Sequence, residues 1–569
     1  MRASLVLKDC RILNVFTGEV VRGDIAVDDG KITGICGEYV GERVIELGGR
    51  FVSPGFIEGH IHIESSMLTP SRFAEIVVPR GTTGVVADPH EVANVLGVRG
   101  INMFLEESRG LPMDLYLTIP SCVPATRLET SGAEIGIREV EELASEPGIV
   151  ALGEVMNYPG VIHGEEGVID KLEAARRMGI PVDGHAPGLR GWELDRYIAA
   201  GVDSDHESTE GEEALEKLRK GMWLMIREGS AARNMDAILS TLVKRGISLE
   251  RCILVSDDRH PRDLLIEGHL DRLVRKAVGM GVGLVDAVRM VSWNPARRFR
   301  LRGVGAIAPG FKAHLTVLSE DLKVELVLFD GVPVAEMGRL RVGIPDYTYD
   351  PEVYRTVRLA RELKPDDFKV PVGMREGSAL ARVMGVMEGS IVTKKLIERL
   401  EVKDGVVEAD PDRDILKAAV VERHRASGRI GLGFVKGFGL KGGALASTVA
   451  HDSHNLIVVG VDDESMAAAC NHLAEMGGGL SLAQDGRIIS SLRLEVAGLM
   501  AGRGADVVAD GLEMLHQECR KLGCTLSSPF MAMSFLSLPV IPELKLTDMG
   551  LVEGFRIVSL FLEHDESRP

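Results

Sequence analysis

The chain has 569 residues, with 66 Lys or Arg and 84 Asp or Glu, which gives a formal net charge of −18 at pH 7. Such an acidic chain lacks the basic surface that nucleic-acid binding requires, so we expect no nucleic-acid partner. Hydrophobic residues make up 45% of the sequence. This content is typical of a globular protein, and the length predicts roughly two to four domains.

Cysteine usage and the absence of long apolar runs narrow the class further. The seven cysteines are scattered and form no CxxC pair, which is typical of a reducing compartment rather than of a disulfide framework. We recognise no signal peptide, and no uninterrupted apolar run reaches about 18 residues. We therefore expect a cytoplasmic protein without a membrane span.

Residues 1–52 have the Val- and Ile-rich alternation of short strands, broken by Asp-Gly and Gly-Gly turns. The stretch VDDGKI is a strong hairpin signal, and we expect a small antiparallel sheet. The same pattern of strands and turns returns at residues 301–345. We therefore predict a small β-sandwich domain that is built from both flanks of the segment between them.

Residues 53–300 alternate apolar strand segments with amphipathic helical segments. Eight strand segments follow one another, with the sequences FIEGHIHI, TTGVVADP, DLYLTI, IVALGEV, PVDGHA, VDSDHE, GMWLMIREG and CILVSDD. This alternation predicts a (β/α)8 barrel of the TIM type. Residues 346–364 have the Pro- and Tyr-rich composition of a linker, and residues 365–569 are expected to form a separate C-terminal α/β domain.

Polar side chains gather at the ends of these predicted strands, where a barrel builds its active site. His60 and His62 are two residues apart, so they point to the same face of the first strand. The ends of the fourth, fifth, sixth and eighth strands carry Glu154, His185, His206 and the pair Asp257 and Asp258. Four histidines and two carboxylates are sufficient to hold two divalent cations.

Each of these residues also has a structural interpretation when it is taken alone. A single His-x-His pair can form a polar strand edge, His185 can be a hydrogen-bonded core histidine, Glu154 can pair with an arginine, and either aspartate can cap a turn. The joint pattern favours the metal site, because each residue falls at the end of a different strand.

The motifs resemble the amidohydrolase superfamily of metal-dependent barrel hydrolases. Within it, the sequence is similar to the adenine deaminase branch in PGFIEGHIHIESSMLTP, GTTGVVADPHEVANVLG, GEVMNYPGV, DGHAPGLRG, DHE, LVSDDRHP and VAHDSHNLIVVG. The resemblance covers nearly the whole chain. It implies the (β/α)8 barrel with its small sheet domain and a C-terminal α/β domain that is typical of this branch.

The resemblance also implies the roles of the candidate ligands. Two divalent cations, Mn²⁺ or Fe²⁺ before Zn²⁺, would be held by His60, His62, His185, His206, Glu154 and Asp257. The first two histidines would bind one cation and the other two the second. Glu154 would bridge the cations, and Asp257 would both ligate the first and act as the proton shuttle.

The implied reaction is hydrolysis of the C–N bond of a cyclic amidine. A metal-activated hydroxide would convert adenine to hypoxanthine and ammonia, in purine salvage. The expected partner is a small purine base, and the chain is expected to form a dimer or larger homo-oligomer. Two alternatives stay open, namely another cyclic amidase or amino-sugar deacetylase of the superfamily, and a non-catalytic barrel scaffold.

Other polar residues lie close to the predicted site. We interpret five of them as substrate-binding candidates, with orientation of a ligand or loop hydrogen bonding as the alternatives: Glu64, His90, Glu91, Ser121 and Asp258. In the C-terminal region, His451 and His454 of the stretch HDSHN are candidates for a lid or an additional ion site. The alternative there is a turn in which Asp452 and Asn455 bond the backbone.

Overall fold

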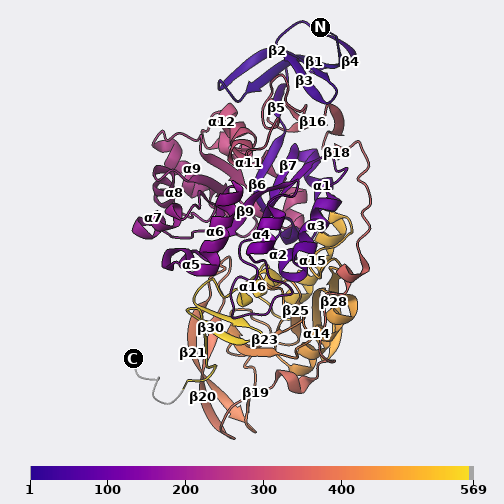
Figure 1. Ribbon diagram of the computed structural model, residues 1–569. Helices are drawn as coiled ribbons and strands as arrows, with labels where there is room; N and C mark the ends of the chain where they lie inside the picture. Colours follow the sequence, from indigo (N-terminus) through magenta and orange to yellow (C-terminus); the bar gives the residue numbers. More distant parts are fainter. Residues whose placement is uncertain (1, 563–569) are drawn as a thin grey trace.

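The computed structural model describes residues 2–562. Figure 1 shows an N-terminal sheet at one end of the molecule, a barrel-like region in the middle and a C-terminal region at the other end. Within the described part of the chain, no helix combines the length and the apolar character that crossing a membrane requires.

A nine-stranded sheet joins the two flanks of the barrel region. Its order is β18-β17-β16-β15-β5-β1-β2-β3, with β4 paired to β1. The strands are β1 (Arg2–Asn14), β2 (Glu19–Asp28), β3 (Lys31–Ile35), β4 (Val40–Glu46), β5 (Phe51–Pro54), β15 (Leu315–Leu318), β16 (Val324–Phe329), β17 (Val332–Glu336) and β18 (Arg339–Leu340). The antiparallel pair β5–β15, which sets Ser53 opposite Thr316, is the seam between the two flanks.

The expectation of a purely antiparallel sheet is wrong at β1. The hairpin signal correctly indicated the antiparallel pair β2–β3, but β1 pairs in parallel with both β4 and β5. A turn signal determines only the pairing of strands that are adjacent in sequence. The 13-residue strand β1 has a second edge, opposite β2. The two later strands β4 and β5 pair with that edge.

The middle region contains short parallel strands in two pieces, ordered β10-β9-β8-β7-β6-β14 and β11-β12-β13. The strands are β6 (Phe56–His62), β7 (Thr82–Ala87), β8 (Asp114–Ile119), β9 (Ile149–Val155), β10 (Val182–Gly184), β11 (Ser204–Asp205), β12 (Trp223–Arg227), β13 (Cys252–Val255) and β14 (Asp257–Asp258). Only Ser256 separates β13 from β14, and Asp203 N–H donates to Val182 O at 3.4 Å beside β10. The strands therefore curl into a TIM-like barrel.

Helices connect the strands of the barrel. They are α1 (Pro70–Val77), α2 (His90–Leu96), α3 (Val98–Glu107), α4 (Ile137–Leu143), α5 (Tyr158–His163), α6 (Glu166–Met178), α7 (Gly191–Ala199), α8 (Gly211–Arg219), α9 (Met235–Lys244), α10 (Pro261–Ile266), α11 (Leu270–Gly279), α12 (Leu284–Arg289) and α13 (Trp293–Arg298). The amphipathic α6 is representative, because it buries Leu172, Ala174 and Ala175. It ends at Gly179, whose φ of 70° is the left-handed conformation that glycine adopts without a steric penalty.

The C-terminal region contains a mixed ten-stranded sheet, ordered β19-β22-β21-β20-β24-β23-β26-β25-β27-β28, and the three-stranded sheet β29-β30-β31. The strands are β19 (Val370–Pro371), β20 (Gly377–Gly385), β21 (Lys394–Lys403), β22 (Val406–Val407), β23 (Ile415–Val421), β24 (Ile430–Lys436), β25 (Ala444–Ser447), β26 (Leu456–Gly460), β27 (Gly479–Gln484), β28 (Arg487–Arg493), β29 (Leu544–Thr547), β30 (Gly550–Glu553) and β31 (Arg556–Val558). The helices are α14 (Asp463–Met476), α15 (Ala505–Lys521) and α16 (Pro529–Ser534). This region is of the mixed α and β composition that the sequence predicts.

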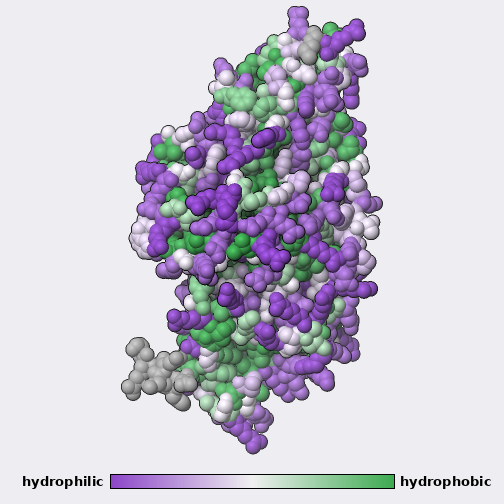
Figure 2. Space-filling model, in the orientation of Figure 1, coloured by the Kyte–Doolittle hydropathy of each residue, from purple (hydrophilic) through white to green (hydrophobic). Residues whose placement is uncertain are grey.

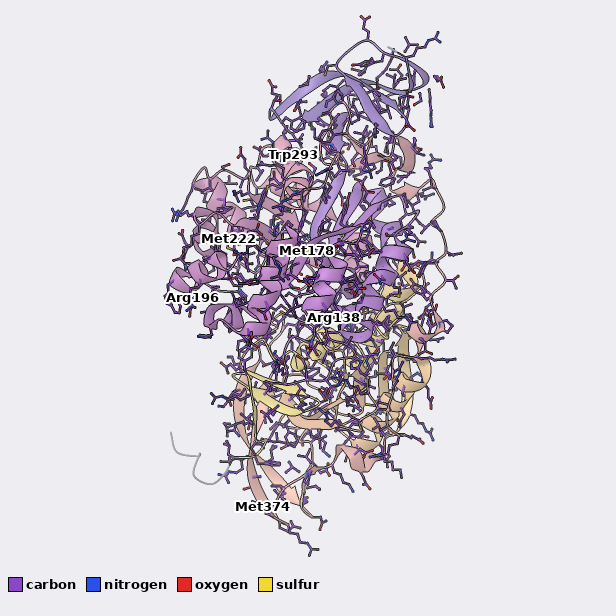
Figure 3. All side chains as sticks on the ribbon, in the orientation of Figure 1. Arg138, Met178, Arg196, Met222, Trp293 and Met374 are labelled. Atoms are coloured by element: carbon purple, nitrogen blue, oxygen red, sulfur yellow. The ribbon has the colours of Figure 1, made fainter. Side chains whose placement is uncertain are left out.

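The hydrophobic core is continuous between the barrel and the C-terminal region. One cluster of buried residues contains Ile61 and Leu152 of the barrel together with Leu445 and Ile457 of the C-terminal sheet. The N-terminal sheet has its own cluster, and it touches the barrel where Phe16 packs on the edge of Trp293, labelled in Figure 3, at 4.9 Å. Hydrophilic side chains cover most of the outer face in Figure 2.

Candidate metal centre

The polar strand ends of the barrel converge on one small cavity. The cavity has a volume of about 70 Å³ and is lined by barrel residues and by residues of the C-terminal region. Its acidic and basic lining residues are His62, His90, Glu91, Glu154, His185, His206, Glu207, Arg227, Asp257, Asp258, His451 and Asp452. Most of the residues that the sequence predicts for the site therefore lie together.

The first predicted group is assembled by the pairing of β14 with β6. This register sets Asp257 opposite Ile61, between the two histidines of β6. Asp257 Oδ1 lies 3.8 Å from His60 Nε2 and 3.4 Å from His62 Nε2. Asp257 also has a positive φ of 56°, a conformation that is uncommon outside glycine and frequent at functional sites.

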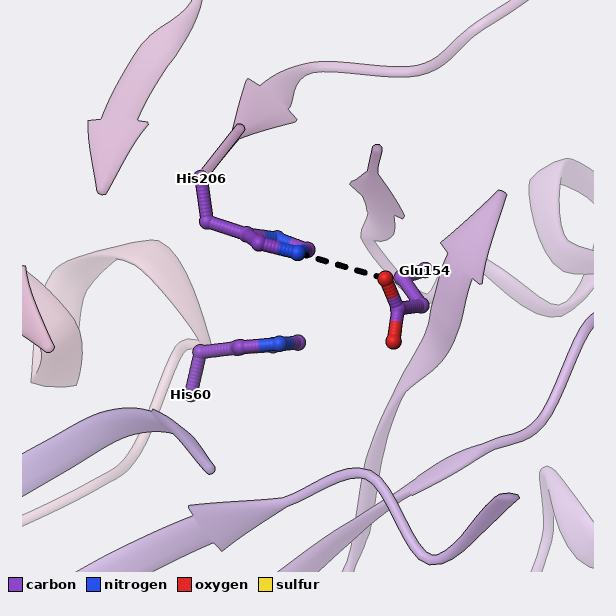
Figure 4. A group of neighbouring side chains, drawn as sticks. All are labelled: His60, Glu154 and His206. Atoms are coloured by element: carbon purple, nitrogen blue, oxygen red, sulfur yellow. Dashed lines mark ion pairs between the residues drawn. The ribbon is translucent and has the colours of Figure 1, made fainter. Parts of the chain in front are cut away.

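Glu154, at the end of β9, stands between the two predicted groups. Its Oε2 lies 2.7 Å from His185 Nδ1 and 3.2 Å from His206 Nε2, and Figure 4 shows the second of these contacts beside His60. Its Oε1 faces the other way and lies 3.3 Å from His62 Nε2. A carboxylate whose two oxygens face two histidine sets has the geometry of a bridging ligand.

The histidines of β6 are oriented by hydrogen bonds on their outer nitrogens. His60 Nδ1 lies 3.2 Å from Asp183 Oδ2, and His62 Nδ1 lies 3.0 Å from the main-chain oxygen of Asp88. These acceptors place a proton on each Nδ1 and turn each Nε2 lone pair toward the cavity, as in known metal sites. His60 Nε2 is buried without a hydrogen-bond partner among the described residues, so this donor set fits divalent cations.

The electrostatics of the centre favour ionised carboxylates. Burial alone would raise the pKa of Glu154, but the adjacent imidazoles of His185 and His206 hold it well below its usual range. Burial likewise opposes ionisation of Asp257, whereas the contacts with His62 and Arg227 lower its pKa. Two buried carboxylates that stay charged attract a divalent cation. The electrostatics of the cavity therefore favour cation binding.

Three further residues lie against the predicted ligands. His90, predicted to bind substrate, places Nδ1 3.4 Å from Glu154 Oε1 and forms a further potential ligand group with His62 and Glu154. Glu207 lies 3.5 Å from His206 and was not predicted. Arg227 was also missed, although it ends the seventh strand; its guanidinium pairs with Glu207 and lies 3.2 Å from Asp257 Oδ2.

The other substrate-binding candidates have different positions. Glu91 and Asp258 line the cavity, as His90 does, whereas Glu64 and Ser121 are not among its lining residues. Glu64 accepts a hydrogen bond from Val92 N–H at 3.1 Å. Ser121 donates to the main-chain oxygen of Glu154 at 2.6 Å, so it supports a strand end.

The histidines of the HDSHN stretch lie beside Glu91. His451 Nδ1 is 3.3 Å from Glu91 Oε1, and His454 Nε2 is 3.7 Å from Glu91 Oε2. Ala450 N–H donates to His454 Nδ1 at 3.1 Å, which places the ring proton on Nε2. A nitrogen that carries a proton offers no lone pair to a metal. This geometry therefore favours the interpretation of the HDSHN stretch as a lid over that of an additional ion site.

Known proteins resemble the chain in sequence over almost its whole length. Residues 51–334 match the amidohydrolase family, and residues 390–556 match the adenine deaminase C-terminal domain. Adenine deaminase 2 of Carboxydothermus hydrogenoformans is 48% identical over 97% of this chain and 95% of its own length. Adenine deaminase of Methanothrix thermoacetophila is 46% identical over 99% and 98%.

Solved structures resemble the chain more distantly. An adenine deaminase crystal structure aligns with a TM-score of 0.44 and 17% identity over 59% of this chain and all of the other. L-Hydantoinase from Arthrobacter aurescens aligns with a TM-score of 0.46 and 16% identity over 60% and 98%. The assignment rests on the sequence relatives, which are far closer. The chain belongs to the adenine deaminase family of amidohydrolases.

Proposed function

We propose that the chain catalyses the hydrolytic deamination of adenine to hypoxanthine and ammonia. The names of its relatives, at 46% to 48% identity over nearly full length, support this activity. The observation that carries the proposal is the position of Glu154, with one oxygen toward His62 and the other toward His185 and His206. The same cavity holds Asp257, a carboxylate suited to moving protons.

Two divalent cations are proposed for this centre. His60, His62 and Asp257 would hold the first, His185 and His206 the second, and Glu154 would contact both. Imidazole and carboxylate ligands admit Mn²⁺, Fe²⁺ and Zn²⁺, and we favour Mn²⁺ or Fe²⁺. Bound there, the cations would supply Lewis acidity, which lowers the pKa of water so that hydroxide is available near pH 7.

Asp257 is the proposed proton carrier of the reaction. It would take a proton from the attacking water and deliver it to a ring nitrogen or to the leaving amine of adenine, as general base and then general acid. Arg227, 3.2 Å from its Oδ2, holds the carboxylate in position. The exocyclic amine then leaves from C6 as ammonia.

His90, Glu91 and Asp258 line the cavity and are the proposed contacts of the purine base. Glu64 and Ser121 do not line the cavity. Glu64 accepts a hydrogen bond from Val92 N–H of α2, the helix that carries two of these contacts, and would orient that helix. Ser121 would support Glu154 through its main-chain oxygen.

We also propose a cellular role, an oligomeric state and domain bounds for the chain. The enzyme would act in cytoplasmic purine salvage. It would form a dimer or larger assembly, and light scattering on the purified protein measures this oligomeric state. Residues 1–52 with 301–345 would form the sheet domain, residues 53–300 the catalytic barrel, and residues 365–569 the C-terminal domain, joined by a linker at 346–364.

A comparison of wild type with Asp257→Asn tests the proposed activity. We expect Mn²⁺-loaded wild type to release ammonia from adenine and the variant to lose about 10²- to 10⁴-fold in kcat, the usual contribution of a positioned acid–base group. Cyclic imides and an N-acetyl sugar phosphate should not be hydrolysed. Unchanged turnover in the variant would contradict the role of Asp257, and turnover of the other substrates alone would contradict the reaction.

A further inference from the structure

The C-terminal region supplies part of the wall of the metal cavity. His451 and Asp452 line the cavity together with Ile391 and Phe535, and all four belong to the C-terminal region rather than to the barrel. The space in which a base must lie is therefore enclosed by both regions. A residue that selects the substrate can come from either of them.

Asp452 brings to this wall a carboxylate that accepts no hydrogen bond from the described residues. The residue is 2% exposed, and its Oδ2 is buried without a hydrogen-bond partner in the described part of the chain. Its Oδ1 lies 3.8 Å from His90 Nε2 and 3.8 Å from His451 Nδ1, beyond hydrogen-bond range. A buried carboxylate without donors is costly, so this oxygen is available to a donor that enters the cavity.

The segment around Asp452 is held on both sides. His451 N–H donates to Ser534 O at 3.0 Å, and Ser537 Oγ donates to His451 O at 3.1 Å. Asn455 Nδ2 donates to Thr130 O of the barrel at 2.8 Å. The carboxylate is thus presented by a fixed backbone, as a recognition group requires.

The ring of His90 lies between Asp452 and Glu154 of the metal centre. One of its nitrogens, Nδ1, lies 3.4 Å from Glu154 Oε1, and the other, Nε2, lies 3.8 Å from Asp452 Oδ1. Asp452 therefore stands one imidazole ring beyond the bridging carboxylate. Asp452 lines the cavity on the side away from the bridging carboxylate, so it is positioned for a ring nitrogen of a purine whose C6 would lie at the centre.

We propose that Asp452 accepts a hydrogen bond from the ring N–H of the five-membered ring and thereby selects free purine bases over bases substituted at that nitrogen. The inference rests on the proposed deamination of adenine and names the determinant of its substrate class. A base with a sugar or methyl group on this nitrogen lacks the proton. It would leave the carboxylate buried without a hydrogen bond, which a site built for a donor penalises strongly.

The test compares adenine with N9-methyladenine and N7-methyladenine on full-length, Mn²⁺-loaded wild type, Asp452→Ala and Asp452→Asn. We expect both substitutions to lower kcat/KM for adenine about 10- to 100-fold, mainly through KM, which is the range for a lost hydrogen bond to a charged group. The preference for adenine over the methylated bases should fall by a similar factor. Inhibition constants replace kcat/KM for a base that is not turned over.

Ser453→Ala is the matched control, because Ser453 is the next residue of the same buried segment and does not line the cavity. It should keep the wild-type preference. A loss of the same factor for all three bases would reveal a merely structural role and overturn the proposal, as would an unchanged preference in both Asp452 variants. If Asp452→Ala does not fold, the isosteric Asn variant decides.

Calorimetric binding of hypoxanthine, which keeps the ring N–H, separates this inference from the proposed activity. We expect about 10-fold or greater weakening in the Asp452 variants, on the same hydrogen-bond argument. If wild type binds purines but releases no ammonia, the proposed function is refuted. The hypoxanthine affinities then decide the role of Asp452 by themselves. Equal hypoxanthine affinity in wild type and variants would refute the inference, whatever the activity.

Discussion

At the scale of single residues, the centre depends on groups that fix the histidine rings. Asp183 carries out this task for His60: its Oδ2 lies 3.2 Å from His60 Nδ1, and both side chains are buried. Ser204 Oγ donates to the other oxygen of Asp183. With the carboxylate held in this way, the pKa of His60 rises to about 9 in the absence of a cation, although burial opposes the shift.

We predict that Asp183→Asn weakens cation binding about 10- to 100-fold, because partners that orient a metal-binding histidine contribute on this scale. An amide keeps the shape but lacks the charge that favours the Nδ1 proton. Competition with a chromogenic chelator on the metal-free protein measures the affinity. Asp195→Asn, at an exposed carboxylate on α7, is the control and should bind like wild type; equal affinity in Asp183→Asn would contradict the argument.

The candidate metal ligands are easier to predict from the sequence than the residues that contact and orient them. His60, Glu154 and His206 are recognisable because each ends a strand of a repeating pattern, and strand ends meet in a barrel. Arg227 and Asp452 are not recognisable in this way. The contact of Arg227 with Asp257 depends on side-chain direction across strands, and that of Asp452 depends on how two separate regions pack.

At the scale of elements, β29 fastens two segments of the cavity wall through Lys545. Its ammonium donates to Ile391 O at 2.8 Å and to Phe535 O at 2.9 Å, and both of these residues line the cavity. No carboxylate lies within ion-pair distance of Lys545 among the described residues, and burial lowers its pKa to about 7.

This shift predicts a pH dependence of stability. Between pH 7 and about 10.4, the ordinary pKa of an unfolded lysine, the unfolded chain binds more protons at this site than the folded chain, so the free energy of unfolding rises with pH. We expect the difference in Tm between wild type and Lys545→Met to shift in favour of wild type from pH 7 to pH 9. Lys394→Met, at an exposed lysine of β21, should show no such trend, and parallel curves for Lys545→Met would refute the prediction.

Some strands and their partners can be predicted from the sequence, and others cannot. The segments around β6 to β9 are predicted well, because their apolar runs are long and the helices between them are amphipathic. The pairing of β1 with β4 and β5 is missed, since no local signal encodes a parallel partner that follows a hairpin. The division of the eighth strand into β13 and β14 at Ser256 is likewise a feature of backbone conformation, which the residue type does not reveal.

At the scale of the whole molecule, the proposed cations couple the site to global stability. A ligand that binds only the folded state adds RT ln(1 + [L]/Kd) to the free energy of unfolding, about 2.7 kcal/mol at one hundred times Kd. Removal of the cations with a chelator should therefore lower Tm, and added Mn²⁺ should raise it again, by an amount that grows with the free Mn²⁺ concentration. Differential scanning fluorimetry measures this shift. Metal analysis of the reloaded and dialysed protein should find two equivalents of Mn²⁺ per chain, and one equivalent would contradict a two-cation centre.

The shared hydrophobic core makes a final prediction about folding. Since one buried cluster contains side chains from both the barrel and the C-terminal sheet, neither region can expose its face of the interface without losing apolar burial. Polar contacts reinforce the junction: Asp548 accepts hydrogen bonds from Thr130 N at 2.9 Å and Thr130 Oγ1 at 2.6 Å. We therefore expect the two regions to unfold together, in one calorimetric transition.

Asp548→Ala tests this coupling from the C-terminal side. It leaves two buried donors of Thr130 unpaired, which costs about 1–3 kcal/mol for each group, so the shared transition should move to lower temperature as a whole. Asp366→Ala, at an exposed carboxylate of the same region, should leave it in place. If the Asp548 variant instead shows a separate, earlier transition while the barrel keeps its wild-type Tm, the two regions are independent folding units, and closure of the metal cavity by Asp452 becomes a docking equilibrium rather than a fixed feature of the fold.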